Sequence, residues 1–492
     1  MVTFFEKIAE HAARIPERVA LFDERCRISY GEMPSLIEAY EKCLIDAGLN
    51  ENSTVGLNIK DDISHILICL ALLKMRAHQA VLASHESDVS HQNLSRRLGV
   101  SHVVRTGEGF DPLNPSLDRF EIVSRSKTEN LQEGGRQSGA VLYVATSGTT
   151  GLPRIVPLPE QLLALQYTHQ SLAFQQERYR KLKWDNCLVL SSCEHSITKR
   201  YRLRSLWVGD TSVFAGSDER SASDLADLIA KRNVTALLVS SQEAQRLASG
   251  GRRVELQTSL HVTGMRVPWD LRKAILQNLC ENLYVFYGAS EVSFISVAVP
   301  GEHDERESVG LPLAHVAVEI VDKEGRSLPI GEIGEIRIRT PATVHSYFDD
   351  PVESAARFRD GWCYPGDMAA LTDTGHLIIH GRKDDMMNLN GINIYPAEIE
   401  RVFEAHPGVA AAAAFPLKSR IHGDIPAVAL ELVPGAIWTE RDFLQYGSDR
   451  LGLRSPRKIV IREALPRNHM GKVLKAEIAA TLLSPLGGEK GV

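Results

Sequence analysis

The stretch "AVLYVATSGTTGLPR", residues 140–154, places an apolar run directly before a loop rich in Gly and hydroxyl side chains. The apolar run is typical of a buried strand. A loop of Ser, Thr and Gly points several backbone N–H groups and hydroxyls toward one place, and such donors bind phosphate oxygens. Arg154 adds a cation at the end of the loop. The stretch therefore predicts a phosphate-binding loop after a strand, with an ordinary Gly/Thr turn as the alternative.

The composition excludes several classes of protein. The 492 residues include 56 basic and 62 acidic side chains and give a net charge of −6, so no nucleic-acid partner is expected. Seven cysteines without a CxxC pair favour a reducing compartment. The N-terminus lacks an apolar signal segment, and the strongest apolar run, "ILICLALL", is too short to span a membrane. We expect a cytoplasmic protein.

Strand-like and helical patterns alternate up to about residue 300, which predicts an α/β fold. Beyond it, "VAVEIVD" and "GEIGEIRIRT" alternate with period two, as antiparallel strands do. The charged "GRKDD" at 381–385 marks a domain boundary. After it, "VAAAAAF" is interpreted as a strand, against the helix propensity of Ala. We expect a large N-terminal domain, 1–382, of α/β subdomains with a small β-barrel-like part, and a small α+β domain, 383–492.

Four further motifs follow the loop in order: "YGASE" (287–291), "YPGD" (364–367), "GRKDD" (381–385) and "NHMGKVLK" (468–475). Together with "TSGTTGLPR" they resemble the adenylate-forming superfamily of acyl- and aryl-CoA synthetases, firefly luciferase and peptide-synthetase adenylation domains. The chain is most similar to a free-standing acyl-CoA ligase. The resemblance implies that a carboxylate attacks the α-phosphate of ATP, that a thiol then attacks the acyl-adenylate, and that the C-terminal domain moves between the two steps.

The resemblance assigns nucleotide binding to two sets of residues. The phosphate set is Thr146, Ser147, Gly148, Thr149, Thr150, Gly151 and Arg154. The adenosine set is Thr263, Gly264, Tyr287, Gly288, Ala289, Ser290, Asp367 and Arg382. Tyr287 would stack on adenine, Asp367 would accept the ribose hydroxyls and Arg382 would reach ribose or phosphate. Arg154 stands where the family usually has Lys, which keeps the charge but replaces an ammonium by a planar fork.

Catalytic roles follow from the same resemblance. Lys472 would meet the α-phosphate and the carboxylate and offset the charge that develops there. Glu291 would ligate Mg²⁺, a cation that prefers oxygen ligands. Asp384 resembles the hinge of the C-terminal domain, and His195 resembles the His that borders the acyl pocket. The preceding residue, Glu194, stands where an aromatic is usual and could instead bind a substrate amino group, as an Asp does in peptide synthetases.

Residues 197–208 carry an unusual set of charges. If they form one helix, Arg200 and Arg204 fall on its apolar arc, while Arg202 falls on the polar side with Thr198 and Ser205. A buried arginine needs a partner. One alternative is an external partner, either a second anionic group on the substrate or a phosphate of CoA. The other is an internal ion pair, or solvent that the guanidinium reaches along its aliphatic stem. The internal alternative is favoured.

The leading hypothesis is an acyl-CoA ligase that uses ATP, Mg²⁺ and CoA to activate a carboxylic acid. One alternative is an enzyme that loads an acid or amino acid onto the phosphopantetheine of an acyl carrier protein, and Gly391 would border the pantetheine channel in either case. Another is a catalytically silent nucleotide-binding homologue, which departures from the family pattern at Arg154, Glu160, Asn388 and the stretch "HSYF" would permit. Retention of Glu291 and Lys472 argues against silence.

Overall fold

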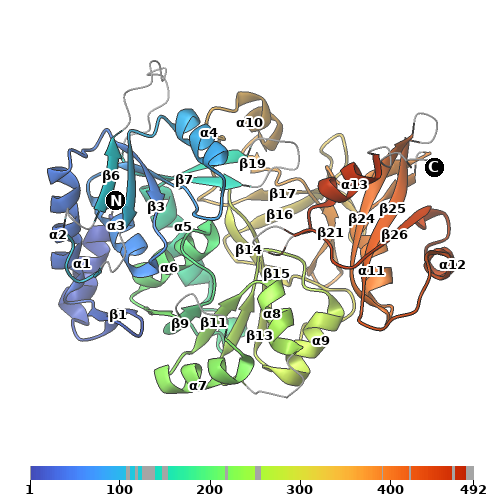
Figure 1. Ribbon diagram of the computed structural model, residues 1–492, viewed down its shortest axis with the longest axis horizontal. Helices are drawn as coiled ribbons and strands as arrows, with labels where there is room; N and C mark the ends of the chain where they lie inside the picture. The colour runs from blue at the N-terminus through green and yellow to red at the C-terminus, as the bar shows by residue number, and fades with distance from the viewer. Residues whose placement is uncertain are drawn as a thin grey trace, which may run out of the picture.

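The computed structural model describes residues 2–106, 111–116, 120–124, 139–146, 153–215, 220–249, 256–390, 392–419, 423–467, 471 and 473–483. Its strands form four sheets (Figure 1). The predicted mixed α/β architecture, with a large N-terminal part and a smaller C-terminal part, is confirmed. No helix among the described residues is long and apolar enough to cross a membrane.

The first sheet has six strands in the order β6-β5-β3-β4-β7-β8. Its central pairs are parallel, and β6 and β8 close the two edges as antiparallel strands. Its strands are β3 (Thr54–Asn58), β4 (His78–Val81), β5 (His102–Thr106), β6 (Phe120–Ser124), β7 (Val141–Thr146) and β8 (Arg154–Pro159).

The second sheet has nine strands in the order β15-β14-β13-β12-β11-β9-β10-β1-β2, with a parallel centre from β13 to β1. Its strands are β1 (Val19–Phe22), β2 (Arg27–Ser29), β9 (Asn186–Val189), β10 (Thr211–Phe214), β11 (Ala236–Val239), β12 (Ser259–Val262), β13 (Leu283–Ala289), β14 (Ser293–Ala298) and β15 (Leu311–Pro312).

Helices pack between and around these two sheets. One apolar cluster joins strands of both sheets to α1 (Phe4–Arg14), α2 (Met33–Asp46), α3 (Asp62–Lys74), α5 (Glu160–Ala173) and α6 (Ser196–Val208). The nine-stranded sheet also packs on α7 (Ala222–Arg232), α8 (Ser241–Ala248) and α9 (Trp269–Asn278). α4 (Asp88–Leu98) packs on the six-stranded sheet. A short 3-10 turn, η3 (Glu177–Tyr179), follows α5.

The third sheet is antiparallel, as the period-two pattern predicts. It contains β16 (Ala317–Val321), β17 (Gly334–Arg339), β18 (Phe358–Arg359), β19 (Trp362–Cys363), β20 (Asp367–Leu371) and β21 (Leu377–Arg382), with α10 (Pro351–Arg357) before β18. No pairing among its described strands closes it into a full barrel. Its apolar side chains share a cluster with β13 and β14, so this sheet packs on the antiparallel edge of the nine-stranded sheet.

The fourth sheet contains β22 (Met387–Leu389), β23 (Ile392–Ile394), β24 (Val409–Ser419), β25 (Gly423–Leu432) and β26 (Lys458–Arg462). It packs against α11 (Pro396–Glu404), α12 (Glu440–Leu451) and α13 (Lys475–Leu483), at the right of Figure 1, and η4 (Gly452–Arg454) follows α12.

The alanine run is a strand, as predicted, because both of its faces are covered. Ala412 and Ala414 of β24 belong to the cluster with α11 and α12, whereas Ala413 and Phe415 belong to the cluster with Ile478 of α13. Alternation between two packed faces favours a strand over the helix that Ala prefers in isolation.

An ion-pair cluster connects α11 to Arg266 and Glu307, which lie in loops beside the nine-stranded sheet. Arg266, which follows β12, donates from Nη1 to Glu404 Oε2 at 2.8 Å and from Nε to Glu307 Oε2 at 2.7 Å. Arg401 Nη2 lies 3.5 Å from the same Glu307 oxygen. Burial raises the pKa of the Glu404 carboxyl to about 7, although Arg266 opposes the rise.

Replacing Glu404 by Gln tests this cluster. The folded-state pKa of Glu404, about 7, exceeds its ordinary value of 4.5, so ionisation costs folded-state stability as pH rises through that window. At pH 8 we expect the free energy of unfolding of Glu404→Gln to be higher than that of wild type by on the order of 2 kcal/mol. This difference should shrink toward pH 5. Denaturant melts across this range measure it, with Glu398→Gln on the same helix as control. A variant less stable than wild type at pH 8 would contradict the assignment.

Candidate active site

Three predicted residues from three strands meet at the carboxylate of Asp367. The Tyr287 hydroxyl, near the end of β13, donates to Asp367 Oδ2 at 2.6 Å. Arg382, which ends β21 and stands opposite Asp367 in the β20–β21 register, donates from Nη1 to Oδ1 at 3.1 Å. Burial, together with Asp367, raises the pKa of Tyr287, so its phenol stays protonated and remains a donor. Both carboxylate oxygens are thereby oriented, and their remaining lone pairs can accept hydrogen bonds from the two hydroxyls of a diol.

Glu291 lies in the turn between β13 and β14. Its Oε1 accepts a 2.7 Å hydrogen bond from the Tyr347 hydroxyl, and the residue is 8% exposed. Gly288 is required at this turn because a Cβ there would lie 2.6 Å from the carbonyl oxygen of Ser293. Among the residues that the structure describes, no group of three or more His, Cys, Asp or Glu forms a metal site. Mg²⁺ is often bound by one or two carboxylates together with substrate phosphates, and the Glu291 carboxylate supplies oxygens of the kind that such a site uses.

The predicted phosphate loop follows β7 and precedes β8 in the chain, and Thr146 stands opposite Arg154 in this antiparallel pair. The Thr146 hydroxyl donates to the Arg154 carbonyl oxygen at 3.4 Å. Arg154 Nη2 lies 2.6 Å from Glu353 Oε1, and its guanidinium lies 5.9 Å from the Tyr347 ring centroid. Since Tyr347 also binds Glu291, the end of the loop and the predicted metal ligand share a neighbour. Ser147, Gly148, Thr149, Thr150, Gly151, Gly391 and Lys472 lie outside the described residues.

Thr263 and Gly264 follow β12, whose neighbour in the sheet is β13. The Thr263 hydroxyl donates to the Phe286 carbonyl oxygen at 3.3 Å, and Gly264 has a φ of +93°, which suits glycine. Both residues therefore lie beside the Tyr287 motif, at the carboxyl ends of parallel strands, where open α/β sheets bind ligands.

Gly471, which precedes Lys472 in the chain, lies near the same edge of the sheet. A Cβ on Gly471 would lie 2.0 Å from Gln242 Oε1, so this residue packs directly against α8. α8 begins two residues after β11, which is the neighbour of β12.

His195 caps the start of α6, and its ring centroid lies 5.4 Å from that of His85. Glu194 accepts hydrogen bonds from the Ser84 backbone N–H at 2.8 Å and from the Ser84 hydroxyl at 2.9 Å. The Glu194 carboxylate, the alternative partner for a substrate amino group, is thus already bound by Ser84.

The prediction that Arg202 lies on a polar face of α6 with Thr198 and Ser205 is wrong. All three residues are 0% exposed. Arg202 donates to the carbonyl oxygens of Cys187 at 3.0 Å and Val189 at 3.2 Å. A helix between two sheets has no solvent face, so Arg202 binds backbone oxygens in place of water.

Two further cations of α6 also have internal partners. Arg204 stacks 4.0 Å from the Trp184 ring centroid and lies 3.9 Å from Asp210 Oδ2. Arg200 Nη2 donates to Gln166 Oε1 at 3.3 Å, and Nη1 lies 3.5 Å from the Ser290 carbonyl oxygen. These contacts favour the internal alternative for both arginines, and they connect Arg200 to the Tyr287–Glu291 motif.

Tyr347, Glu353 and Arg357 are contacts of the site that sequence reasoning missed. Arg357 Nε donates to Glu353 Oε1 at 2.7 Å, and its Nη2 donates to Asp384 Oδ2 at 2.9 Å. Their i,i+4 spacing on α10 indicates an ion pair within the helix. The spacing does not predict the tertiary partners of this pair, which are Arg154 for Glu353 and Asp384 for Arg357.

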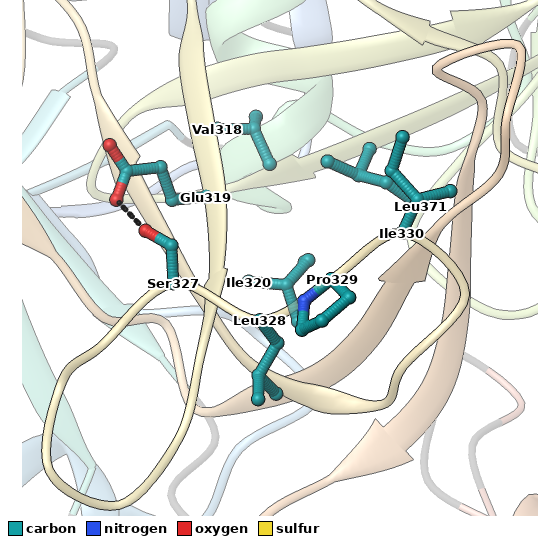
Figure 2. A pocket seen from close by; sticks show the side chains of 8 residues that line it. All are labelled: Val318, Glu319, Ile320, Ser327, Leu328, Pro329, Ile330 and Leu371. Carbon is teal, nitrogen blue, oxygen red and sulfur yellow. Dashed lines mark hydrogen bonds between the residues drawn. The ribbon is translucent and has the colours of Figure 1, made fainter.

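A separate pocket of about 120 Å³ lies beside β16, and one wall carries the Ser327–Glu319 hydrogen bond (Figure 2). Its lining residues are Val318, Glu319, Ile320, Ser327, Leu328, Pro329, Ile330 and Leu371. None of them is a predicted site residue, and the pocket offers few polar groups, so it is not the candidate active site.

A family model described as AMP-binding enzyme matches residues 8–348. The chain belongs to the AMP-binding enzyme family. A 4-chlorobenzoate–CoA ligase from Arthrobacter sp is 26% identical over 505 residues, which cover 96% of this chain and 94% of that protein. The fatty acid–[acyl-carrier-protein] ligase ScoC from Streptomyces coeruleorubidus is 28% identical over 353 residues, which cover 69% of this chain and 66% of that protein.

The fold is shared with solved structures. O-succinylbenzoate coenzyme A synthetase (MenE) from Bacillus subtilis, in complex with ATP and magnesium ion, matches with a TM-score of 0.80 and 22% identity, covering 96% of this chain and 98% of that chain. The expected resemblance to adenylate-forming enzymes, most like CoA ligases, is therefore confirmed for this member of the AMP-binding family.

Arg200→Met tests whether this arginine acts inside the protein. Because its contacts join α6 to the Ser290 backbone, we expect kcat/KM to fall by about tenfold for every acid, with acid preference unchanged. Steady-state assays with linear mono- and dicarboxylic acids of matched length measure this. A loss confined to dicarboxylic acids would instead assign Arg200 to a substrate carboxylate.

Lys199 offers a second test on the same helix. It is 0% exposed, and its Nζ has no hydrogen-bond partner in the described part of the chain. Burial lowers its pKa below the ordinary 10.5, so keeping the ammonium charged costs folded-state stability below the folded-state pKa, and this cost fades as pH rises toward 10.5. We expect Lys199→Met to raise the free energy of unfolding by about 1–3 kcal/mol at pH 7. Melts at pH 7 and pH 10 check this, and an advantage that does not shrink at pH 10 would refute it.

Proposed function

We propose that this AMP-binding enzyme activates a carboxylic acid with ATP as an acyl-adenylate and transfers the acyl group to CoA. The observation that carries the proposal is the oriented Asp367 carboxylate, held by Tyr287 and Arg382 on the side of the site that would face a ribose. Glu291 and Arg154 lie around Tyr347 nearby, where the phosphates and their Mg²⁺ would bind. The family match and the similarity to named CoA ligases support the same activity.

The first step concentrates negative charge at the α-phosphorus, and the chain's own residues must offset it. Tyr287 and Asp367 would fix the nucleoside, so the α-phosphate is placed before the acid attacks. Bound Mg²⁺ would supply charge neutralisation at the phosphate oxygens. Glu291 would hold that ion, Arg154 would face the outer phosphates, and Lys472 would bring an ammonium to the developing charge.

Lys472 would come from a C-terminal domain of residues 383–492 that rotates about Asp384 relative to a domain of residues 1–382. The approach of Gly471 to Gln242 supports a position of this segment over the carboxyl ends of the strands during the first step. His195 would border the acid, and Gly391 the pantetheine. We also propose a cytoplasmic location, which the seven free thiols and the use of ATP and CoA support.

A second acceptor is favoured by one observation. ScoC, which is 28% identical over 69% of this chain, is named as a ligase that acts on an acyl carrier protein. Transfer to the phosphopantetheine of a carrier protein is therefore the second candidate, and it uses the same first step.

A two-stage screen tests the proposal. Exchange of labelled pyrophosphate into ATP is followed with a panel of aromatic, linear and branched acids and amino acids. Exchange that depends on an acid supports the first step, and its absence across the panel, with nucleotide bound, would favour a silent homologue. Mass detection of the thioester after addition of CoA, or of a phosphopantetheinylated carrier protein, then decides between the acceptors.

Lys472→Ala is expected to reduce acid-dependent exchange by about 10²–10³-fold, since it removes one charge that acts at the reacting centre. Conversion of a supplied acyl-adenylate and CoA to the thioester should continue, because pyrophosphate is released before this step and the α-phosphate is no longer attacked. The matched control is Lys475→Ala, whose ammonium lies 2.6 Å from Glu400 Oε1 on α11. Undiminished exchange in Lys472→Ala would refute the role of Lys472.

A further inference from the structure

A line of ion pairs joins the end of the phosphate loop to the residue predicted as the hinge. Glu353 Oε1 lies 2.6 Å from Arg154 Nη2 and accepts a 2.7 Å hydrogen bond from Arg357 Nε. Arg357 Nη2 in turn donates to Asp384 Oδ2 at 2.9 Å. Because Glu353 and Arg357 lie one turn apart on α10, a single short helix carries both central charges of this line.

The line continues to the nucleoside part of the site. Arg382 Nη2 lies 3.9 Å from the same Asp384 oxygen, and its Nη1 donates to Asp367 at 3.1 Å. Three cations therefore alternate with three carboxylates from Arg154 to Asp367. Each group has neighbours of opposite charge, so a new anion at one end changes the balance along the line.

These ion pairs are partly buried, so their electrostatic interactions are stronger than those of fully exposed pairs. The side chains of Arg154 and Arg357 are 14% and 9% exposed and those of Glu353 and Asp384 are 26% and 31% exposed, so solvent screens these pairs less than it screens fully exposed ones. A Cβ on Gly366 would lie 2.0 Å from Arg357 Nη1, so the guanidinium packs on the backbone directly before Asp367. The Arg357 guanidinium can therefore strengthen its hydrogen bond to Glu353 at the expense of the one to Asp384, or the reverse. The packing leaves it little space to move away from both carboxylates.

We propose that Glu353 is a positioning residue that competes with the outer phosphates of ATP for Arg154, and that Arg357 transmits this competition to Asp384. The inference rests on the proposed function, which places those phosphates at Arg154. With no triphosphate, Glu353 neutralises Arg154. When phosphate draws Arg154 away, Glu353 is left to Arg357 alone, and the hold of Arg357 on Asp384 weakens. Departure of pyrophosphate reverses the change.

This arrangement gives an acyl-adenylate enzyme a means to sense its leaving group. Arg154 meets only the outer phosphates, which leave as pyrophosphate, whereas the adenylate stays on Asp367. The state of the hinge residue would then report whether pyrophosphate has gone. Because binding free energies are reciprocal, a weaker hold on Asp384 must also favour triphosphate binding.

The test compares two nucleotides that differ in their outer phosphates. Calorimetry gives Kd values for α,β-methylene-ATP and for AMP. The readout is the affinity for α,β-methylene-ATP divided by the affinity for AMP. Glu353→Gln should tighten the triphosphate by about tenfold and leave AMP unchanged, since Arg154 is released from its carboxylate. Asp384→Asn should raise the ratio by a smaller factor, because Arg357 then neutralises Glu353 more fully. A merely structural role for Glu353 would change both nucleotides alike.

Two controls make the result specific. In an Arg154→Met background, Glu353→Gln should no longer change the ratio, which is the double-mutant signature of a direct pair. Glu335→Gln removes another carboxylate beside the hinge, which accepts from Lys383 Nζ at 2.8 Å, and should leave the ratio as in wild type. Glu353→Asp, which keeps the charge but shortens its reach, should fall between wild type and Glu353→Gln, and it serves if the Gln variant does not fold.

The outcomes separate the two proposals. Wild type that binds both nucleotides, with an unchanged ratio in the Glu353 variants, overturns this inference and leaves the proposed function standing. An effect of Glu353→Gln that persists without Arg154 also overturns it. Wild type that binds neither nucleotide overturns the proposed function and this inference together.

Discussion

The candidate site depends on one carboxylate. Asp367 begins β20 and is held by a phenol from β13 and a guanidinium from β21, so it links the nine-stranded mixed sheet to the antiparallel sheet packed on its edge. A half-buried carboxylate in this position needs both donors, because an unpaired charge there would cost several kcal/mol, on the order of 3–5. The same constraint that stabilises the junction of the two sheets orients the oxygens that would receive a ribose.

The second organising feature is the burial of α6 between the two large sheets. A helix in this position is normally apolar all round. Here it carries four cations. Its three arginines contact backbone oxygens, a side-chain amide, aromatic rings and a carboxylate in place of solvent, whereas Lys199 Nζ has no hydrogen-bond partner among the described residues. Arg200 uses this burial to connect the helix to the backbone of Ser290. Stability and the shape of the site are therefore coupled along one helix.

Much of the site was accessible from the sequence because its residues occur in short ordered motifs. Tyr287, Asp367, Arg382 and Asp384 were named in advance, and the structure places them in one connected group. The face of Arg202 was predicted wrongly because helical periodicity assumes one wet face, and this helix has none. Tyr347 and Glu353 were missed because a Tyr and a Glu in a turn and a short helix carry no signal of the side chains they will contact.

The sequence by itself determined the family, the α/β order of elements and the residues predicted to face a nucleotide, because these depend on local periodicity, turn chemistry and short motifs. Only the tertiary structure decided which charges neutralise one another. Glu353 lies 199 positions after Arg154 in the chain, yet the fold brings Glu353 Oε1 within 2.6 Å of Arg154 Nη2. Electrostatic pairing depends on distance in space, and no local pattern encodes that distance.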